Sequence, residues 1–149
     1  MADVTITPAN VVPATQNTRY QGGSNFVTGE AIAAGEGVCI FADAGVQKYY
    51  KADANNADRV NYIGVAGNSA PAGGQRLDVV SAATFAAPFV VGTHGVALGT
   101  PLFVSNNAGK FCPYADLTAG SFVILAGWAA TTTGLQLTSE AKGGIARAA

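Results

Sequence analysis

Charged residues are scarce in this chain of 149 residues: Asp, Glu, Lys and Arg make up 11% of it, against about 25% in typical soluble domains. The basic residues are scattered, so no basic stripe could neutralise a phosphate backbone, and we expect no nucleic-acid partner. Hydrophobic residues reach 49%, which argues against disorder over most of the chain. A lone monomer with a net charge of −1 tends to associate, so we expect a permanent protein partner or a homo-oligomer.

Long apolar runs and a recognisable leader are also missing. The longest apolar stretches, residues 82–91 and 122–130, are too short to span a bilayer, so we expect no membrane contact. The opening residues MADVTITPAN have neither a basic start nor an apolar core. We therefore expect no signal peptide, and assembly in a cytoplasm.

The common zinc ligands are nearly absent, because the chain has two cysteines and one histidine. Cys39 and Cys112 lack CxxC spacing, so zinc binding is poorly supported, and we expect neither a metal nor a cofactor. We interpret both cysteines as small buried hydrophobic residues, with a disulfide or a redox role as the alternative.

Catalytic signatures are missing as well, so we predict that the protein is not an enzyme. His94 stands in the string GTHG, where we expect an exposed loop residue. No GxSxG motif accompanies the residues that could complete a triad with it. Those residues are Asp78, Ser81 and Ser105.

Four acidic residues, Glu36, Asp43, Asp53 and Asp58, lie close together in the sequence, and paired carboxylates can act as general acid and base. We assign Asp43 to a hairpin turn and the last two to the polar link KADANNADR, where Asp and Asn are ordinary turn residues. The string DANNADR resembles a calcium loop, but it lacks the central Gly and the final Glu of the EF-hand pattern.

The chain contains one module twice. AAGEGVCIFADAG (residues 33–45) returns as VALGTPLFVSNNAG (96–109), and NYIGVAG (61–67) returns as ILAGWAA (124–130). The copies agree in their glycines and apolar positions and differ in nearly every polar residue, so the repeated part is scaffold. The predicted scaffold glycines form three pairs: Gly35 and Gly99, Gly45 and Gly109, Gly64 and Gly127.

Each copy predicts the same series of short strands separated by turn signals. The expected strands are residues 37–42, 46–51, 60–66 and 75–80 in the first copy, and 100–105, 110–114, 121–129 and 135–138 in the second. Residues 81–91 form a crossover strand between the copies. The pattern predicts an all-β fold, a compact barrel or sandwich of two similar modules. The β domain spans residues 26–138, with repeat one at 26–80 and repeat two at 89–138.

The two ends of the chain differ from the modules. Residues 1–25 contain Pro8 and Pro13 and predict an extended N-terminal arm that docks on a neighbouring chain, with a frayed terminus as the alternative. The candidate contact residues in this arm are Val11, Val12, Arg19 and Tyr20. Residues 139–149 begin like a helix cap at Ser139 and Glu140, and we expect a short turn or a loose tail.

Aromatic residues supply the remaining candidates. Trp128 stands in a strand whose two faces are both apolar, so we expect it to be fully buried in the core or at a subunit interface. Tyr49, Tyr50 and Tyr114 are interpreted as exposed loop aromatics. They support an alternative function, a head-fibre or host-surface or carbohydrate-binding β module.

Three motifs in a fixed order carry a family resemblance: AIAAGEGVCIFADAG (31–45), IGVA (63–66) and APAGGQRLDVV (70–80). With their duplication, which covers residues 26–138, they resemble the small bacteriophage head-decoration proteins, also called capsid cement proteins. The resemblance implies an all-β structural protein on the outer surface of the virion. It implies homotrimers that clamp neighbouring major capsid subunits, with an N-terminal arm reaching across the surface. It supplies no catalytic residues.

Overall fold

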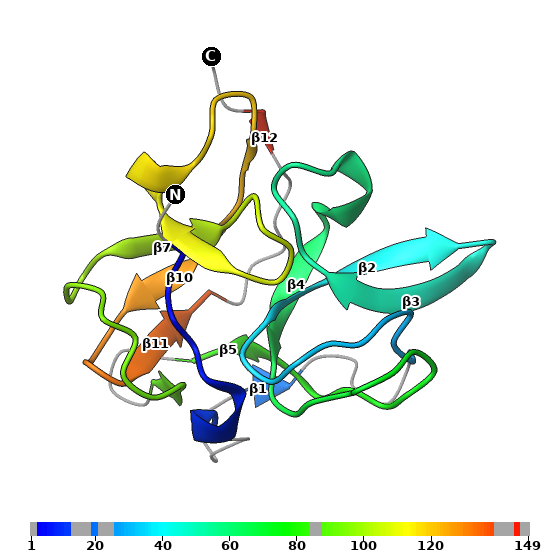
Figure 1. The fold of residues 1–149 in the computed structure, drawn as a ribbon, viewed down its shortest axis with the longest axis horizontal. Coiled ribbons are helices and arrows are strands. Elements are labelled where there is room, and N and C mark those ends of the chain that lie inside the picture. Colours follow the sequence, from blue (N-terminus) through cyan, green and yellow to red (C-terminus); the bar gives the residue numbers. More distant parts are fainter. Residues whose placement is uncertain (1–2, 13–18, 21–25, 84–87, 139–144, 147–149) are drawn as a thin grey trace.

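The computed structural model describes residues 3–12, 19–20, 26–83, 88–138 and 145–146, and within them the chain forms β-strands joined by turns and short 3-10 helices (Figure 1). The first sheet contains β1 (Arg19–Tyr20), β2 (Gly37–Asp43), β3 (Val46–Lys51), β4 (Tyr62–Ala66) and β5 (Val79–Ala82). The second sheet contains β6 (Phe89–Val90), β7 (Pro101–Val104), β8 (Phe111–Pro113), β10 (Leu125–Ala129) and β11 (Gly134–Leu137). A two-stranded ribbon pairs β9 (Phe122–Val123) with β12 (Ile145–Ala146). The 3-10 helices are η1 (Pro8–Asn10), η2 (Ala57–Arg59) and η3 (Tyr114–Asp116).

The two large sheets have the same strand order. The first runs β1-β5-β4-β2-β3 and the second runs β6-β11-β10-β7-β8, with all neighbours antiparallel. The predicted all-β fold class is therefore confirmed, and the duplicated sequence corresponds to a duplicated topology. Residues 84–87 of the predicted crossover strand lie outside the described residues, and the flanking strands β5 and β6 belong to different sheets.

The duplication extends to the pairing of individual residues. In the first module Val38 pairs with Gly64, and the register then shifts by a bulge before the next pair. In the second module Leu102 pairs with Gly127, and the register shifts at the equivalent place. A bulge that recurs at the same register is a conserved feature of the module, because it re-aims every side chain beyond it.

Gly64 and Gly127 mark the closest backbone approach in each sheet. A Cβ atom on Gly64 would lie 2.5 Å from the carbonyl oxygen of Val80, and one on Gly127 would lie 1.9 Å from that of Gln136. Both oxygens belong to the neighbouring strand of the same sheet, so no side chain fits at either position.

Gly35 and Gly99 serve the turn that leads into each module. Each has a positive φ, near +88° and +81°, where residues other than glycine are strained. Their N–H groups donate to the carbonyls of Ala66 and Ala129, equivalent residues, at 2.8 Å in both cases. The turns of the two modules are thus closed by the same hydrogen bond.

One face of the first sheet is buried by the second sheet. Tyr62 on the first sheet packs edge-on against Phe111 of the second, with ring centroids 6.2 Å apart. Both residues belong to a single apolar cluster that draws on the two modules and includes Cys39, Tyr50, Val65, Val80, Leu102, Val104 and Leu135.

The other face of the first sheet is covered by its own loops. Val38, Tyr49 and Val79 form a second, smaller cluster with residues of the connections at 26–32 and 67–78. The β4–β5 connection spans residues 67–78, whereas its counterpart between β10 and β11 spans only 130–133. The short connection leaves the second sheet free to pack on the first.

The described part of the predicted arm lies along the domain. The N–H of Val4 donates to the carbonyl of Phe111 at 2.7 Å, and that of Val12 donates to Val90 at 2.9 Å. Val4 and Val11 are buried in the large cluster. The expected contact residue Val11 therefore faces this chain's own core, which is a correction.

The remaining strand predictions differ from the structure in detail. The strand expected at residues 75–80 begins only at Val79, because the preceding residues follow the loop that covers the outer face. The strand expected at 121–129 is split into β9 and β10, which pair with different partners. Ser139 and Glu140, the expected helix cap, lie outside the described residues, and the tail contributes β12.

Replacing Gly127 by alanine should destabilise the protein by about 3 kcal/mol or more, the upper end of over-packing costs, because the new methyl group meets backbone atoms. Gly99→Ala is the matched control: its φ is also unfavourable for alanine, but no atom lies within 4 Å of the new methyl group. It should cost only about 1–2 kcal/mol. Urea unfolding measures both, and equal losses would contradict the close approach.

Candidate interaction surfaces

His94 is buried rather than exposed, which corrects the sequence prediction. Its Nδ1 accepts from the N–H of Val96 at 3.2 Å, so Nε2 carries the proton and donates to the carbonyl of Thr131 at 2.6 Å. Because the backbone engages both ring nitrogens, the ring holds the loop after β6 against the β10–β11 connection. The hypothetical triad does not form: Ser105 donates to Asp3 at 2.5 Å, and the N–H of Asp78 donates to Asn68.

The acidic residues make local contacts. Glu36 accepts from the N–H of Ala33 within its own turn, and Asp53 accepts from the N–H of Asn55. Asp58 lies in η2, which Asn56 caps by accepting from its N–H. Asp43 ends β2, where its carboxylate accepts from the Tyr50 hydroxyl at 2.9 Å and lies 3.6 Å from the Lys48 ammonium.

Within the described part of the chain, no three metal-ligating side chains gather into a group. Cys39 and Cys112 are both buried, as predicted, and neither forms a disulfide. Burial raises the pKa of Cys39 to about 12, although the nearby Arg59 opposes the shift.

Tyr49 and Tyr50 are strand residues of the core, so the prediction that they are exposed loop aromatics is wrong. They alternate on β3, one facing the outer cluster and the other the inner cluster. The Arg59 guanidinium lies over the Tyr50 ring at 4.0 Å and over Phe41 at 4.7 Å. Tyr114 is the one of the three candidates that is exposed, at 48%.

The second sheet leaves one of its faces open to solvent. Direct cross-strand partners share a face, and these partners are Phe103 with Leu125, and Trp128 with both Pro101 and Gln136. We call these five residues the open face. Pro101 is exposed and the other four are half-buried.

The first module buries the residues at the equivalent positions. They are Gly37, Cys39, Tyr62, Val65 and Val80, which have the same cross-strand register. The second sheet covers them, whereas no described segment covers the open face to the same extent. Trp128 is therefore not fully buried in the core of its own chain, and its burial at a subunit interface stays a prediction.

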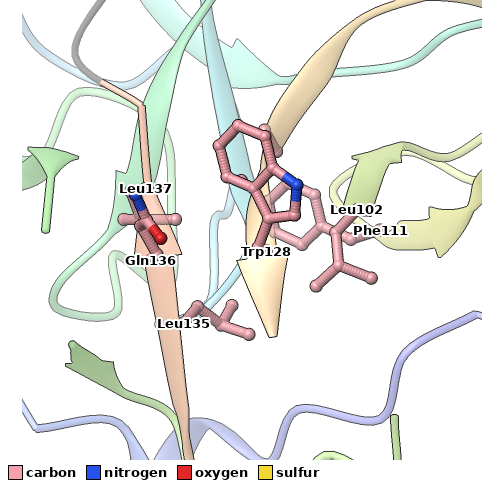
Figure 2. Close-up of a pocket in the computed structure, with 8 residues that line it drawn as sticks. Leu102, Phe111, Trp128, Leu135, Gln136 and Leu137 are labelled. Atoms are coloured by element: carbon pink, nitrogen blue, oxygen red, sulfur yellow. The ribbon is translucent and has the colours of Figure 1, made fainter. Parts of the chain in front are cut away.

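Trp128 borders a shallow pocket of about 320 Å³ together with Gly99, Ala129 and Gln136. Figure 2 shows a second pocket, which Trp128 on β10 lines together with Leu102, Phe111 and, on the neighbouring strand, Gln136. The indole lies outside both apolar clusters, so it offers an aromatic surface next to a polar amide.

Two further apolar side chains are exposed at defined places. Val12, a predicted contact residue, is 44% exposed although its backbone is held by Val90. Val46 is 56% exposed at the tip of the β2–β3 hairpin, which extends away from the rest of the molecule (Figure 1). The other predicted contacts, Arg19 and Tyr20, form β1, whose backbone pairs with β5.

No protein-family model, curated protein or solved structure matches this chain. Among the described residues, no helix is long and apolar enough to cross a membrane. Function must therefore be argued from the surfaces themselves.

Neither thiol should react with Ellman's reagent at neutral pH in the folded protein, and both should react after denaturation, because both are buried. Folding should also become pH-dependent in alkali. The unfolded chain ionises Cys39 near its ordinary pKa of 9.0 and the folded protein only near 12, so the free energy of unfolding should fall as the pH rises through this window. Cys39→Ala should lose part of that decline. Rapid labelling of the folded protein would contradict the burial.

Proposed function

We propose that this protein is a structural virion protein that binds the outer surface of a bacteriophage head, bridging and stabilising neighbouring major capsid subunits. Its partners are then the major capsid protein and further copies of itself, expected as a homotrimer. The ordered glycine motifs support this proposal, since they resemble those of head-decoration proteins.

The observation that carries the proposal is that the hydrogen bonds shared by the two modules join backbone atoms. The Gly35–Ala66 bond recurs as Gly99–Ala129, while the neighbouring side chains Glu36 and Thr100 differ chemically. A duplication that repeats scaffold and no reactive group favours a role in contact rather than in catalysis.

The physical demands on a decoration protein match a rigid, sparsely charged β domain. A filled head is under outward pressure from confined DNA, and a protein across capsomer junctions opposes it by adding buried interface. A specific contact buries at least about 1,000 Å², and many such contacts on one shell reinforce each other by multivalency. The low charge of this chain and its exposed apolar residues suit broad contact of this kind.

Purified protein should bind stoichiometrically to expanded, undecorated heads of the phage that encodes it, and should raise the temperature at which those heads break. Co-sedimentation and a thermal-disruption assay measure the two effects. Absence of binding at micromolar concentration would refute the proposal.

Val12→Asp tests the role of the N-terminal segment in that binding. The side chain is exposed and the backbone bond to Val90 is kept, so the fold should persist while attachment weakens by more than about tenfold, as for an interface hot spot. Val27→Asp, at a similarly exposed valine, is the matched control. Deleting the whole segment is a poorer test, because Val4 and Val11 belong to the core.

A head-fibre or host-surface or carbohydrate-binding module is the second candidate, and the half-buried Trp128 beside Gln136 favours it. Aromatic faces and amides are typical groups for binding sugars. A glycan array probed with the protein would then show ligands that Trp128→Ala loses and Val27→Asp keeps. An array without any ligand would eliminate this alternative.

A further inference from the structure

The chain contains an internal example of one module docking on another. The tip of the β7–β8 hairpin, residues 105–110, packs against the end of the first sheet. There Gly109 accepts from the N–H of Gly37 at 2.9 Å and donates to the carbonyl of Ala52 at 2.8 Å. The carbonyl of Ser105 accepts from Ala54 at 2.9 Å. Ala52 and Ala54 are completely buried by this contact and its surroundings.

The glycines that correspond to Gly109 and to the turn glycine Gly35 have open space around them in the described part of the chain. Gly45 at the tip of the β2–β3 hairpin corresponds to Gly109, and the turn glycine Gly99 corresponds to Gly35. A Cβ on Gly109 would meet Glu36 at 2.6 Å and one on Gly35 would meet Ile6 at 2.4 Å. A Cβ on Gly45 or on Gly99 would meet nothing within 4 Å.

The shared register identifies where an equivalent docking site lies on the second sheet. Val38 pairs with Lys51 as Leu102 pairs with Pro113, so Ala52 corresponds to Tyr114 and Gly37 corresponds to Pro101. We call Pro101, Tyr114 and the nearby Leu98 the docking edge, which adjoins the open face.

The docking edge and the free hairpin tip both carry exposed apolar side chains. Leu98 is 61% exposed and Tyr114 is 48% exposed, whereas Ala34 and Ala52, their counterparts, are buried. At the tip, residues 42–47 are all exposed, and Val46 is 56% exposed, whereas Gly109, the counterpart of Gly45, is buried. One chain therefore exposes both an apolar edge and a hairpin tip whose glycine has a buried counterpart.

We propose that the β2–β3 tip of one copy docks on the docking edge of a second copy, as the β7–β8 tip docks on the first sheet within each chain. The contact is head-to-tail, because a tip on one copy meets an edge on the next, so each copy can both give and receive. This inference rests on the self-association in the proposed function and is independent of binding to capsid.

The contact between copies differs from the internal contact in two ways. Pro101 has no N–H, so the hydrogen bond that Gly37 makes cannot be repeated, and the Tyr114 carbonyl, which would accept from Gly45, already accepts from the N–H of Leu117 at 3.1 Å. Residues 67–78 already cover the outer face of the first sheet in the copy that gives the tip. That sheet therefore does not stack on the open face of the receiving copy, and only the tip docks. A weaker and more hydrophobic contact than the internal one follows.

Sizing by light scattering tests the association with paired variants. Wild type should be larger than a monomer, whereas Val46→Asp and Tyr114→Asp should each be monomeric. Thermal unfolding confirms that each variant is folded, and Val27→Asp, elsewhere on the surface, should behave as wild type. Wild-type size retained by both variants would overturn the proposal.

Disulfide trapping tests the geometry directly. A mixture of Val46→Cys chains with Tyr114→Cys chains should form a covalent dimer on mild oxidation, whereas Val27→Cys mixed with Tyr114→Cys should not. The native thiols are buried and do not compete. The measurement is made in solution and on decorated heads.

The outcomes separate this inference from the proposed function. No Val46–Tyr114 disulfide in either setting overturns the head-to-tail contact, even when wild type still sediments with heads. Conversely, the disulfide in solution supports the contact even when wild type fails to bind heads.

Discussion

The apolar contact between the two sheets is the interaction on which the rest of the structure depends. Val65 and Val80 of the first sheet and Leu102 and Leu135 of the second share one cluster, so neither module buries its inner residues alone. Apolar burial stabilises by about 25 cal/mol per Å². With so few ion pairs available to this sequence, this burial is the main stabilising term, and it joins the two repeats into one folding unit. The N-terminal residues then close the seam between them, through Val4.

The two sheets pack through faces that are not equivalent in the two modules. This packing explains which sequence predictions were confirmed and which were wrong. The series of strands and the turn glycines follow from local patterns that are the same in both copies, whereas the two cysteines stand at different positions in the copies and are buried as small apolar residues. Val65 and Trp128 occupy equivalent positions, yet Val65 is buried and Trp128 is half-exposed. The other sheet covers the face that carries Val65, whereas the equivalent face of the second sheet is open. No local pattern encodes that difference. His94 was also misjudged, since its flanking glycines indicate a loop but not that the ring fills a buried niche between backbone groups.

The same asymmetry organises the functional hypotheses. Gly37 and Gly109 bond to each other inside the chain, and their counterparts Pro101 and Gly45 face solvent. Duplication followed by one internal contact leaves one exposed tip and one exposed edge. A protein built in this way is suited to joining subunits on a surface, and its specificity then depends on residues that the repeat does not share. The sequence predicted the exposure of Tyr114, but not that of Leu98, which becomes distinctive only once its counterpart Ala34 is known to be buried.

The hydrogen bond from Ser105 to Asp3 has a consequence for synthesis on the ribosome. The two residues are 102 positions apart, so Asp3 cannot reach its final place until Ser105 has been made. At about 5–20 residues per second, that delay is roughly 5–20 s. In the last part of this interval, after residue 82 has been made, the first module is complete except for the cover over its inner face. The nascent chain therefore carries an apolar surface that two neighbouring ribosomes on one message would expose to each other, and a chaperone that holds it until residue 111 has emerged would favour correct closure.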